Sequence, residues 1–275
     1  MISSENTPNL DNRSRKLREL IIRALAGGQR GHIGSSMSLV EIIRVLYDDF
    51  LKFNSAEPMW DDRDRFILSK GHGCLALYAI LVDKGFIPVE ELDRFCHEDG
   101  ILGGHPEKDK VPGIEASTGA LGHGLPIAVG MAIASRLKNM TCRIVVVVGD
   151  GEINEGAVWE AALSASKHKL SNLSVFIDYN KIQSYGFTKT VVDLEPLSQK
   201  WEAFGFGVTE VDGHDISALK ALTQKLPLVN DRPSAIICHT IKGKGISYAE
   251  NNPMWHHKSK ISAEEIKSMY DSIKL

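Results

Sequence analysis

Residues 145–156 read VVVVGDGEINEG. Four consecutive valines without polar alternation predict a strand that is covered on both faces, as in a parallel sheet. The run leads directly into Asp150, which stands between Gly149 and Gly151. A carboxylate at the end of a buried strand is costly unless it is solvated, paired or bound to a cation. The stretch therefore places either a turn or a ligand site at the end of a central strand.

Further short apolar runs surround this stretch and extend the same prediction. They are RFILS (65–69), LSVFID (173–178), FGVTEV (206–211) and SAIICHT (234–240). Helical patterns lie between them, so we expect an α/β fold in which helices flank both faces of a parallel sheet. Ligands of such sheets bind beyond the carboxyl ends of the strands. We expect one domain over residues 1–275, with a flexible tail at residues 1–12.

Four helix starts carry capping signals. Ser38 with Glu41, and Ser262 with Glu265, have the spacing of a capping box. Asn154 and Asp215 stand where an N-cap side chain accepts a hydrogen bond from the first turn. A helix that starts at Asn154 would direct free N–H groups toward an anion near Asp150.

Composition excludes several classes of protein. A formal net charge of −3 over 275 residues gives no electrostatic reason to bind nucleic acid or an anionic membrane surface. No apolar run approaches the ~20 residues that cross a bilayer, and the first residues have no apolar core of a secretory signal. The four cysteines are scattered without a CxxC pair. We therefore expect a cytoplasmic protein with reduced thiols.

Histidines follow glycines unusually often. Five of the ten histidines do so, whereas 24 glycines in 275 residues predict about one such pair by chance. The five are His32, His72, His105, His123 and His214. Each alone is compatible with a solvated turn, but the recurrence favours imidazoles on loops where the backbone approaches a ligand closely.

Asn180 follows the next strand, 30 residues after Asp150. One strand–helix–strand step has about this length, so the two side chains can meet at one edge of the sheet. Carboxylate and amide oxygens shared with phosphate suit Mg²⁺. A strand-end turn is the alternative for GDG alone. Neither a GxGxxG fingerprint nor a Walker A lysine is present.

GDG followed by this asparagine resembles the thiamine diphosphate fingerprint. The chain resembles the N-terminal, diphosphate-binding half of transketolase, because seven motifs occur in the family's order. They are GHIGSSMS, SKGHG, GGHPE, EASTGALGHGL, GDGEINEGAVWEAA, IDYNKIQ and TIKGKGISYAENNPMWHHK. The resemblance implies the thiamine diphosphate-binding fold.

The resemblance also implies roles for individual residues. Asp150 and Asn180 would bind Mg²⁺ together with the Ile182 carbonyl, and Gly151 would lie against the diphosphate. The other expected cofactor contacts are Gly119 and Leu121 at the aminopyrimidine. The expected catalytic residues are His32, His72, His105 and His256, which would line the channel over the thiazolium, and Glu155, which would lie at the subunit interface between paired active sites.

Two residues depart from the family pattern. His123 stands where the family commonly has glutamine in the cofactor cradle. His257 stands where glycine usually follows the late histidine. We assign that histidine to His256 because Trp255 and Lys258 then keep their register, with His257 as the alternative.

By this resemblance the chain would be one subunit of a two-chain transketolase, which moves a two-carbon ketol unit from a ketose (phosphate) to an aldose (phosphate). It ends at Leu275 after a capped helix. The pyrimidine-binding domain with its catalytic glutamate would therefore come from a separate C-terminal subunit, in a two-plus-two assembly. Other thiamine diphosphate enzymes remain open, either like the α chain of a 2-oxo acid dehydrogenase or like deoxyxylulose phosphate synthase. So do a non-enzymatic phosphate-binding module and an Mg²⁺-dependent phosphohydrolase.

Overall fold

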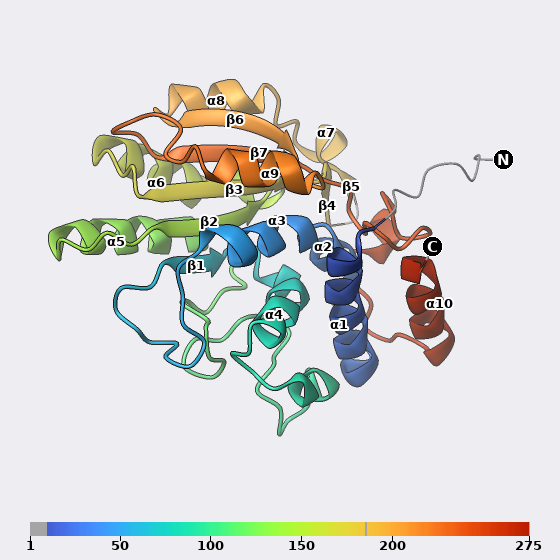
Figure 1. Cartoon of the computed structure of the whole chain (residues 1–275). Helices are drawn as coiled ribbons and strands as arrows, with labels where there is room; N and C mark the ends of the chain where they lie inside the picture. Colours follow the sequence, from blue (N-terminus) through green and yellow to red (C-terminus); the bar gives the residue numbers. More distant parts are fainter. Residues whose placement is uncertain (1–9, 185, 275) are drawn as a thin grey trace.

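A five-stranded parallel sheet forms the centre of the molecule (Figure 1). The structure, a computed structural model, describes residues 10–184 and 186–274. The strand order is β1 (Arg65–Leu68), β2 (Ile144–Gly149), β3 (Leu173–Tyr179), β7 (Ser234–His239) and β6 (Gly207–Asp212). All neighbouring strands pair in parallel, so their carboxyl ends lie at one edge. Each of the five predicted strands is confirmed to within a residue or two of its ends.

The four valines of the opening stretch contribute to two separate cores. Val145 and Val147 pack in one cluster, and Val146 and Val148 pack in the other. This alternation confirms that both faces of the sheet are covered, as the unbroken apolar run predicted. In Figure 1, α3 and α9 cross in front of the sheet.

Two sets of helices supply these cores. The first core takes residues from α1 (Asn12–Gly28), α3 (Val40–Val45), α4 (Cys74–Asp83), α9 (Ile216–Thr223) and α10 (Ala263–Lys274). The second takes residues from α5 (Gly124–Leu137), α6 (Gly156–Lys167) and α8 (Leu197–Ala203). The fold is therefore the expected α/β arrangement.

Short elements complete the described chain. They are α2 (Ile33–Met37), η1 (Leu46–Phe50), η2 (Gly71–Gly73), η3 (Val89–Arg94), η4 (Glu152–Asn154), β4 (Ile182–Gln183), β5 (Gly186–Phe187), α7 (Thr188–Val191) and η5 (Pro253–Trp255). Several of them, such as η2 and η4, directly follow strands of the sheet and form its carboxyl edge.

Two of the four predicted helix caps are confirmed. Asp215 accepts a hydrogen bond from the Ala218 amide at 3.0 Å. Ser262 and Glu265 form a reciprocal capping box, with N–H to oxygen distances of 2.8 and 3.2 Å.

The other two caps are wrong, because tertiary partners take the side chains. Ser38 Oγ donates to Asp178, and Glu41 binds Arg18, so α3 begins without a side-chain cap. Asn154 ends the 3₁₀ turn η4, and α6 begins at Gly156. The Asn154 amide donates instead to Gln183 Oε1 at 3.0 Å.

Helix α1 begins inside the stretch that we expected to be a flexible tail. Asp11 caps α1 by accepting from the Arg13 and Ser14 amides, and the helix starts at Asn12. The remainder of the predicted tail, residues 1–9, lies outside the described residues.

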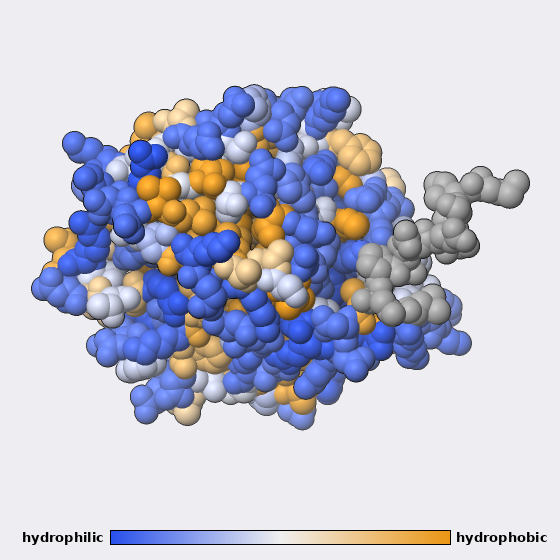
Figure 2. Space-filling view, turned by 45° about the horizontal axis from the view of Figure 1, so that its top comes forward, coloured by the Kyte–Doolittle hydropathy of each residue, from blue (hydrophilic) through white to orange (hydrophobic). Residues whose placement is uncertain are grey.

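The surface carries mostly hydrophilic residues on the face seen in Figure 2, with apolar residues gathered mainly in its upper left half. Across the part of the chain that the structure describes, no helix combines the length and the apolar character that crossing a membrane requires.

Candidate active site

A cavity of about 360 Å³ opens at the carboxyl edge of the sheet. Its walls come from the loops that follow β1, β2, β3 and β7, as expected for ligand sites of parallel sheets. Ten of the predicted site residues line it: His32, His72, His105, Gly119, Leu121, Asp150, Gly151, Asn180, Ile182 and His256. Glu155 is not in the lining.

Asp150 is a buried carboxylate without a cationic side chain in hydrogen-bonding contact among the described residues. Its oxygens accept from the backbone amides of Gly151 at 2.7 Å and Lys181 at 2.5 Å. Burial, and then the negative charge of Asp178, raise the pKa of Asp150 to about 7. A cation bound here would relieve that cost.

Asn180 and Ile182 bring two more oxygens to the same wall. Asn180 Oδ1 accepts from the Ile182 amide at 3.1 Å, which orients the amide group. The Ile182 carbonyl accepts from Lys242 Nζ at 2.8 Å. Burial lowers the pKa of Lys242 to about 8, although the charges of Asp150 and Asp178 partly offset it. Lys242 was not predicted, and it places a cation beside the carboxylate.

A second buried ion pair lies beneath the cavity and was also missed. Lys70 Nζ binds Asp178 Oδ2, with both side chains almost fully buried. Ser38, Thr240 and the Asn180 amide donate to the same carboxylate. Burial alone raises the pKa of Asp178, but Lys70 and these donors hold it below its usual value. The pair fixes Asn180 and the loop that carries His72.

Glu152 holds the loop of Gly119 and Leu121 against the end of β2. Its carboxylate accepts from the amides of Gly122 at 2.9 Å and Gly149 at 3.0 Å, and from Ser69 Oγ. Burial raises the pKa of Glu152. The residue follows GDG directly in the sequence, but nothing in that position distinguishes it from a helix-start charge.

Two glycines bring the backbone close to the cavity. A Cβ on Gly151 would come within 2.5 Å of Gln183 Cβ. Gly119 has φ +147°, and a Cβ there would meet the His105 ring at 3.1 Å. Both positions therefore exclude larger residues at the wall.

Four histidines form a cluster across the cavity from Asp150. The His32 ring centroid lies 5.3 Å from those of His72 and His256, and 6.1 Å from that of His105. Burial is the main cause that lowers the pKa of each ring, to about 3 for His32 and His256. Neutral imidazoles at ordinary pH are suited to accept protons.

The two residues that depart from the family pattern lie outside this cavity. The exposed His123 places its Nδ1 3.0 Å from the Leu121 carbonyl. His257 lies on the other side of His32, with ring centroids 4.4 Å apart. His256 is thus the late histidine that lines the cavity.

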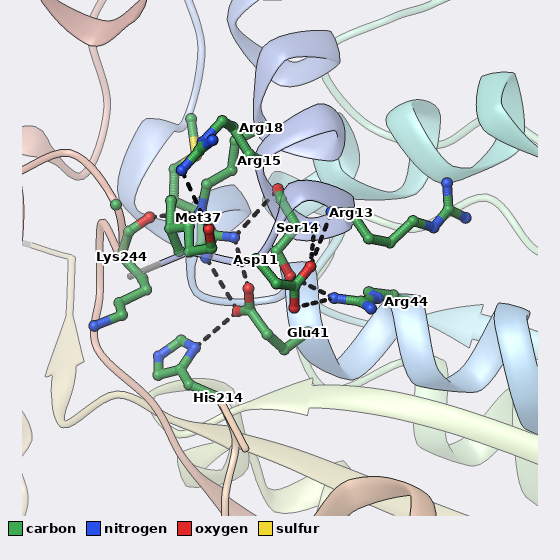
Figure 3. A network of polar contacts seen from close by, with 12 residues as sticks. Asp11, Arg13, Ser14, Arg15, Arg18, Met37, Glu41, Arg44, His214 and Lys244 are labelled. Atoms are coloured by element: carbon green, nitrogen blue, oxygen red, sulfur yellow. Dashed lines mark hydrogen bonds and ion pairs between the residues drawn. The ribbon is translucent and has the colours of Figure 1, made fainter. Parts of the chain in front are cut away.

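A buried network supports the segment that carries Lys242 (Figure 3). The Glu41 carboxylate binds Arg18 through both oxygens, at 2.6 and 3.0 Å. Arg18 Nε donates to the Lys244 carbonyl at 2.9 Å, and the Ile241 amide donates to His214 Nε2 at 2.9 Å. The network therefore holds the backbone on both sides of Lys242.

The oxygen donors fit a hard cation. Within residues 10–184 and 186–274, no group of three or more His, Cys, Asp or Glu side chains could hold a metal ion. The set at Asp150 consists instead of one carboxylate, one side-chain amide and one backbone carbonyl, as Mg²⁺ accepts when phosphate completes its coordination. The uncompensated charge of Asp150 favours this interpretation.

Comparison with known proteins defines the class. A family model described as transketolase, thiamine diphosphate binding domain, matches residues 11–273. One of the two apulose-4-phosphate transketolase subunits of Actinobacillus succinogenes is 44% identical over 251 residues, which cover 90% of each chain. A 6-deoxy-6-sulfo-D-fructose transketolase subunit of a Clostridium species is 38% identical over 261 residues, covering 95% of this chain and 94% of the relative.

Solved structures agree with these relatives. Transketolase from Leishmania mexicana has a TM-score of 0.88 at 32% identity, and a Pichia stipitis transketolase in complex with sedoheptulose 7-phosphate has 0.88 at 31%. The matches cover 95% and 96% of this chain but only 40% of each solved chain. The molecule is thus a thiamine diphosphate-binding α/β protein. The chain belongs to the transketolase family.

Proposed function

We propose that this chain is the diphosphate-binding subunit of a two-chain transketolase. The observation that carries the proposal is the single cavity in which the oxygens of Asp150, Asn180 and Ile182 lie opposite a cluster of neutral histidines. The names of the two relatives described above support it, because both are transketolase subunits of similar length. The reaction would transfer a two-carbon ketol unit from a ketose to an aldose.

Asp150, Asn180 and the Ile182 carbonyl would hold Mg²⁺, which in turn would bind the cofactor's diphosphate. Gly151 leaves room for the diphosphate beside the Asp150 loop, and Lys242 places a positive charge on the same wall. When bound, thiamine diphosphate supplies the carbanion chemistry of ketol transfer. Gly119 and Leu121 would contact its aminopyrimidine end.

The histidines would handle protons on the sugar. His32, His72, His105 and His256 are buried enough to be neutral, so each can accept a proton from a hydroxyl group and return it. Their rings lie within 5.3–6.1 Å of His32, which lets two of them contact neighbouring hydroxyls of one substrate.

The partner would be a second subunit that carries the pyrimidine-binding domain and its catalytic glutamate. We further propose that two copies of this chain meet through the exposed face of α5 and α6, in a two-plus-two assembly. Ile127 and Leu163 expose 37% and 59% of their surface there. Glu155 is exposed at the start of α6, so it would reach the other copy.

Reconstitution tests the proposal. The purified chain with thiamine diphosphate, Mg²⁺ and a ketose donor should show no ketol transfer, and activity should appear when a subunit with the pyrimidine-binding domain is added. Robust turnover by the chain alone would overturn the two-chain assignment. A reconstituted complex that decarboxylates 2-oxo acids, without ketol transfer, would instead favour another thiamine diphosphate enzyme.

A further inference from the structure

A second cavity of about 250 Å³ lies beyond the histidine cluster. It shares His32 and His105 with the first cavity, so these two rings form the boundary between the two spaces. Arg30, Cys96 and His257 line its other walls. We call this space the arginine annex. Its position means that a substrate in contact with the histidines can extend into it.

Arg30 and His257 come from two segments that pair with each other. The Gly31 amide donates to the Lys258 carbonyl at 2.9 Å, and the Lys258 amide donates back to the Gly31 carbonyl at 3.0 Å. This bridge makes Arg30 and His257 neighbours of a paired couple of residues. The positive charge of Arg30 acts on both His257 and the Cys96 thiol, which places the guanidinium between them.

The annex is a positive site without a compensating acid. Among the described residues, no carboxylate lines it, and Arg30 takes part in no ion pair. The neighbouring Lys258 differs, because its ammonium lies over the Trp255 ring and pairs with Glu265 at 3.5 Å. An arginine that faces a cavity and has no partner is suited to bind a tetrahedral oxyanion through two N–H groups.

We propose that the arginine annex binds the anionic end of the sugar substrate, a phosphate or a sulfonate, with Arg30 as the principal contact and His257 as a second donor. The proposal rests on the proposed function, since it requires a sugar whose reacting end lies at the histidine cluster. His257, which occupies the position of a usual glycine, narrows the annex and adds a polar group. The two residues thus select charged sugars over neutral ones.

Equilibrium binding to the full-length chain, loaded with thiamine diphosphate and Mg²⁺, tests the proposal. The probes are fructose 6-phosphate, 6-deoxy-6-sulfofructose and fructose. We expect at least one of the two anions to bind about tenfold more tightly than fructose, and Arg30→Gln to remove most of that preference. The anion with the stronger preference identifies the source of the charge. His257→Gly should reduce the preference by a smaller factor.

The controls separate this proposal from the proposed function. Arg232→Gln changes an exposed arginine elsewhere on the surface and should keep the preference. Thiamine diphosphate affinity should be the same in Arg30→Gln and the wild type. A wild-type chain that binds the cofactor but does not prefer either anion, or an Arg30→Gln chain that keeps the preference, overturns the annex alone. A chain that binds no thiamine diphosphate overturns the proposed function.

Discussion

Glu41 Oε2 lies 2.8 Å from His214 Nδ1, although the two residues are 173 positions apart. His214 Nε2 accepts the Ile241 amide proton, so the ring hydrogen is on Nδ1 and donates to Glu41. Arg18 binds the same carboxylate from the other side. One buried acid therefore ties α1 and α3 to the segment that carries Lys242 into the active site.

Glu41→Gln should destabilise the fold strongly. Burial raises the pKa of Glu41, but Arg18 and His214 more than offset this and hold it below its usual range, so the group is charged in the folded chain. Removing the charge leaves Arg18 buried without its counter-ion, which costs roughly 3–5 kcal/mol. Urea unfolding at neutral pH measures the loss.

Asp93→Asn is the matched control, because it removes an acid from the exposed pair with Arg23. Exposed pairs contribute about 1 kcal/mol or less. Equal effects of the two substitutions would contradict the assigned role of Glu41.

The histidine cluster predicts a pH dependence of stability. The pKa of His32 and of His256 is about 3 in the folded chain, chiefly because of burial, whereas an unfolded histidine has a pKa near 6.5. Between these values the unfolded chain binds more protons. The free energy of unfolding should therefore fall as the pH falls below about 6.5, by at most about 1.4 kcal/mol per group per pH unit.

Asp150 acts in the opposite direction. Its raised pKa of about 7 stabilises the fold at low pH and is lost as the pH rises from about 4 to 7. The test is therefore the difference between variants. His256→Gln should reduce the slope of stability between pH 5 and pH 7, compared with the wild type, while the exposed His168→Gln should not. Identical slopes in all three chains would refute the prediction.

Asp150→Ala should abolish Mg²⁺-dependent binding of thiamine diphosphate. The substitution removes the only side-chain carboxylate of the proposed oxygen set and leaves Asn180 and the Ile182 carbonyl. Calorimetric titration with and without Mg²⁺ measures the effect, and Asp62→Ala, in an exposed loop, is the control. An affinity that is unchanged in Asp150→Ala and still depends on Mg²⁺ would contradict the metal assignment.

The parts of the site that the sequence predicts are those with local signals. The unbroken valines predict a doubly covered strand, and a spacing of one strand–helix–strand step places Asp150 and Asn180 at one edge. Lys70 and Asp178 carry no such signal, because their ion pair joins positions 108 residues apart. Their contact arises only from the packing of the sheet.

The wrong helix caps have a related cause. The Ser38–Glu41 spacing is a valid local signal, but Arg18 and His214 bind Glu41 and Asp178 binds Ser38. Charged contacts in a buried environment outweigh a cap, which contributes about 1 kcal/mol. Sequence patterns therefore fail here where a tertiary partner competes for the same side chain.

Replacing Ile127 and Leu163 together by glutamate should prevent self-association of this chain. Both side chains are partly exposed on helices α5 and α6, and neighbouring Gly130 and Gly156 have open space where a Cβ would stand. Such a surface allows two helices to approach closely, and buried carboxylates at the contact would oppose it. Met59→Glu, with the parent side chain 69% exposed in the loop before β1, is the control. Sedimentation should show a wild-type and Met59→Glu dimer and a monomeric double variant; a monomeric wild type, or a double variant that dimerises equally well, would exclude this face.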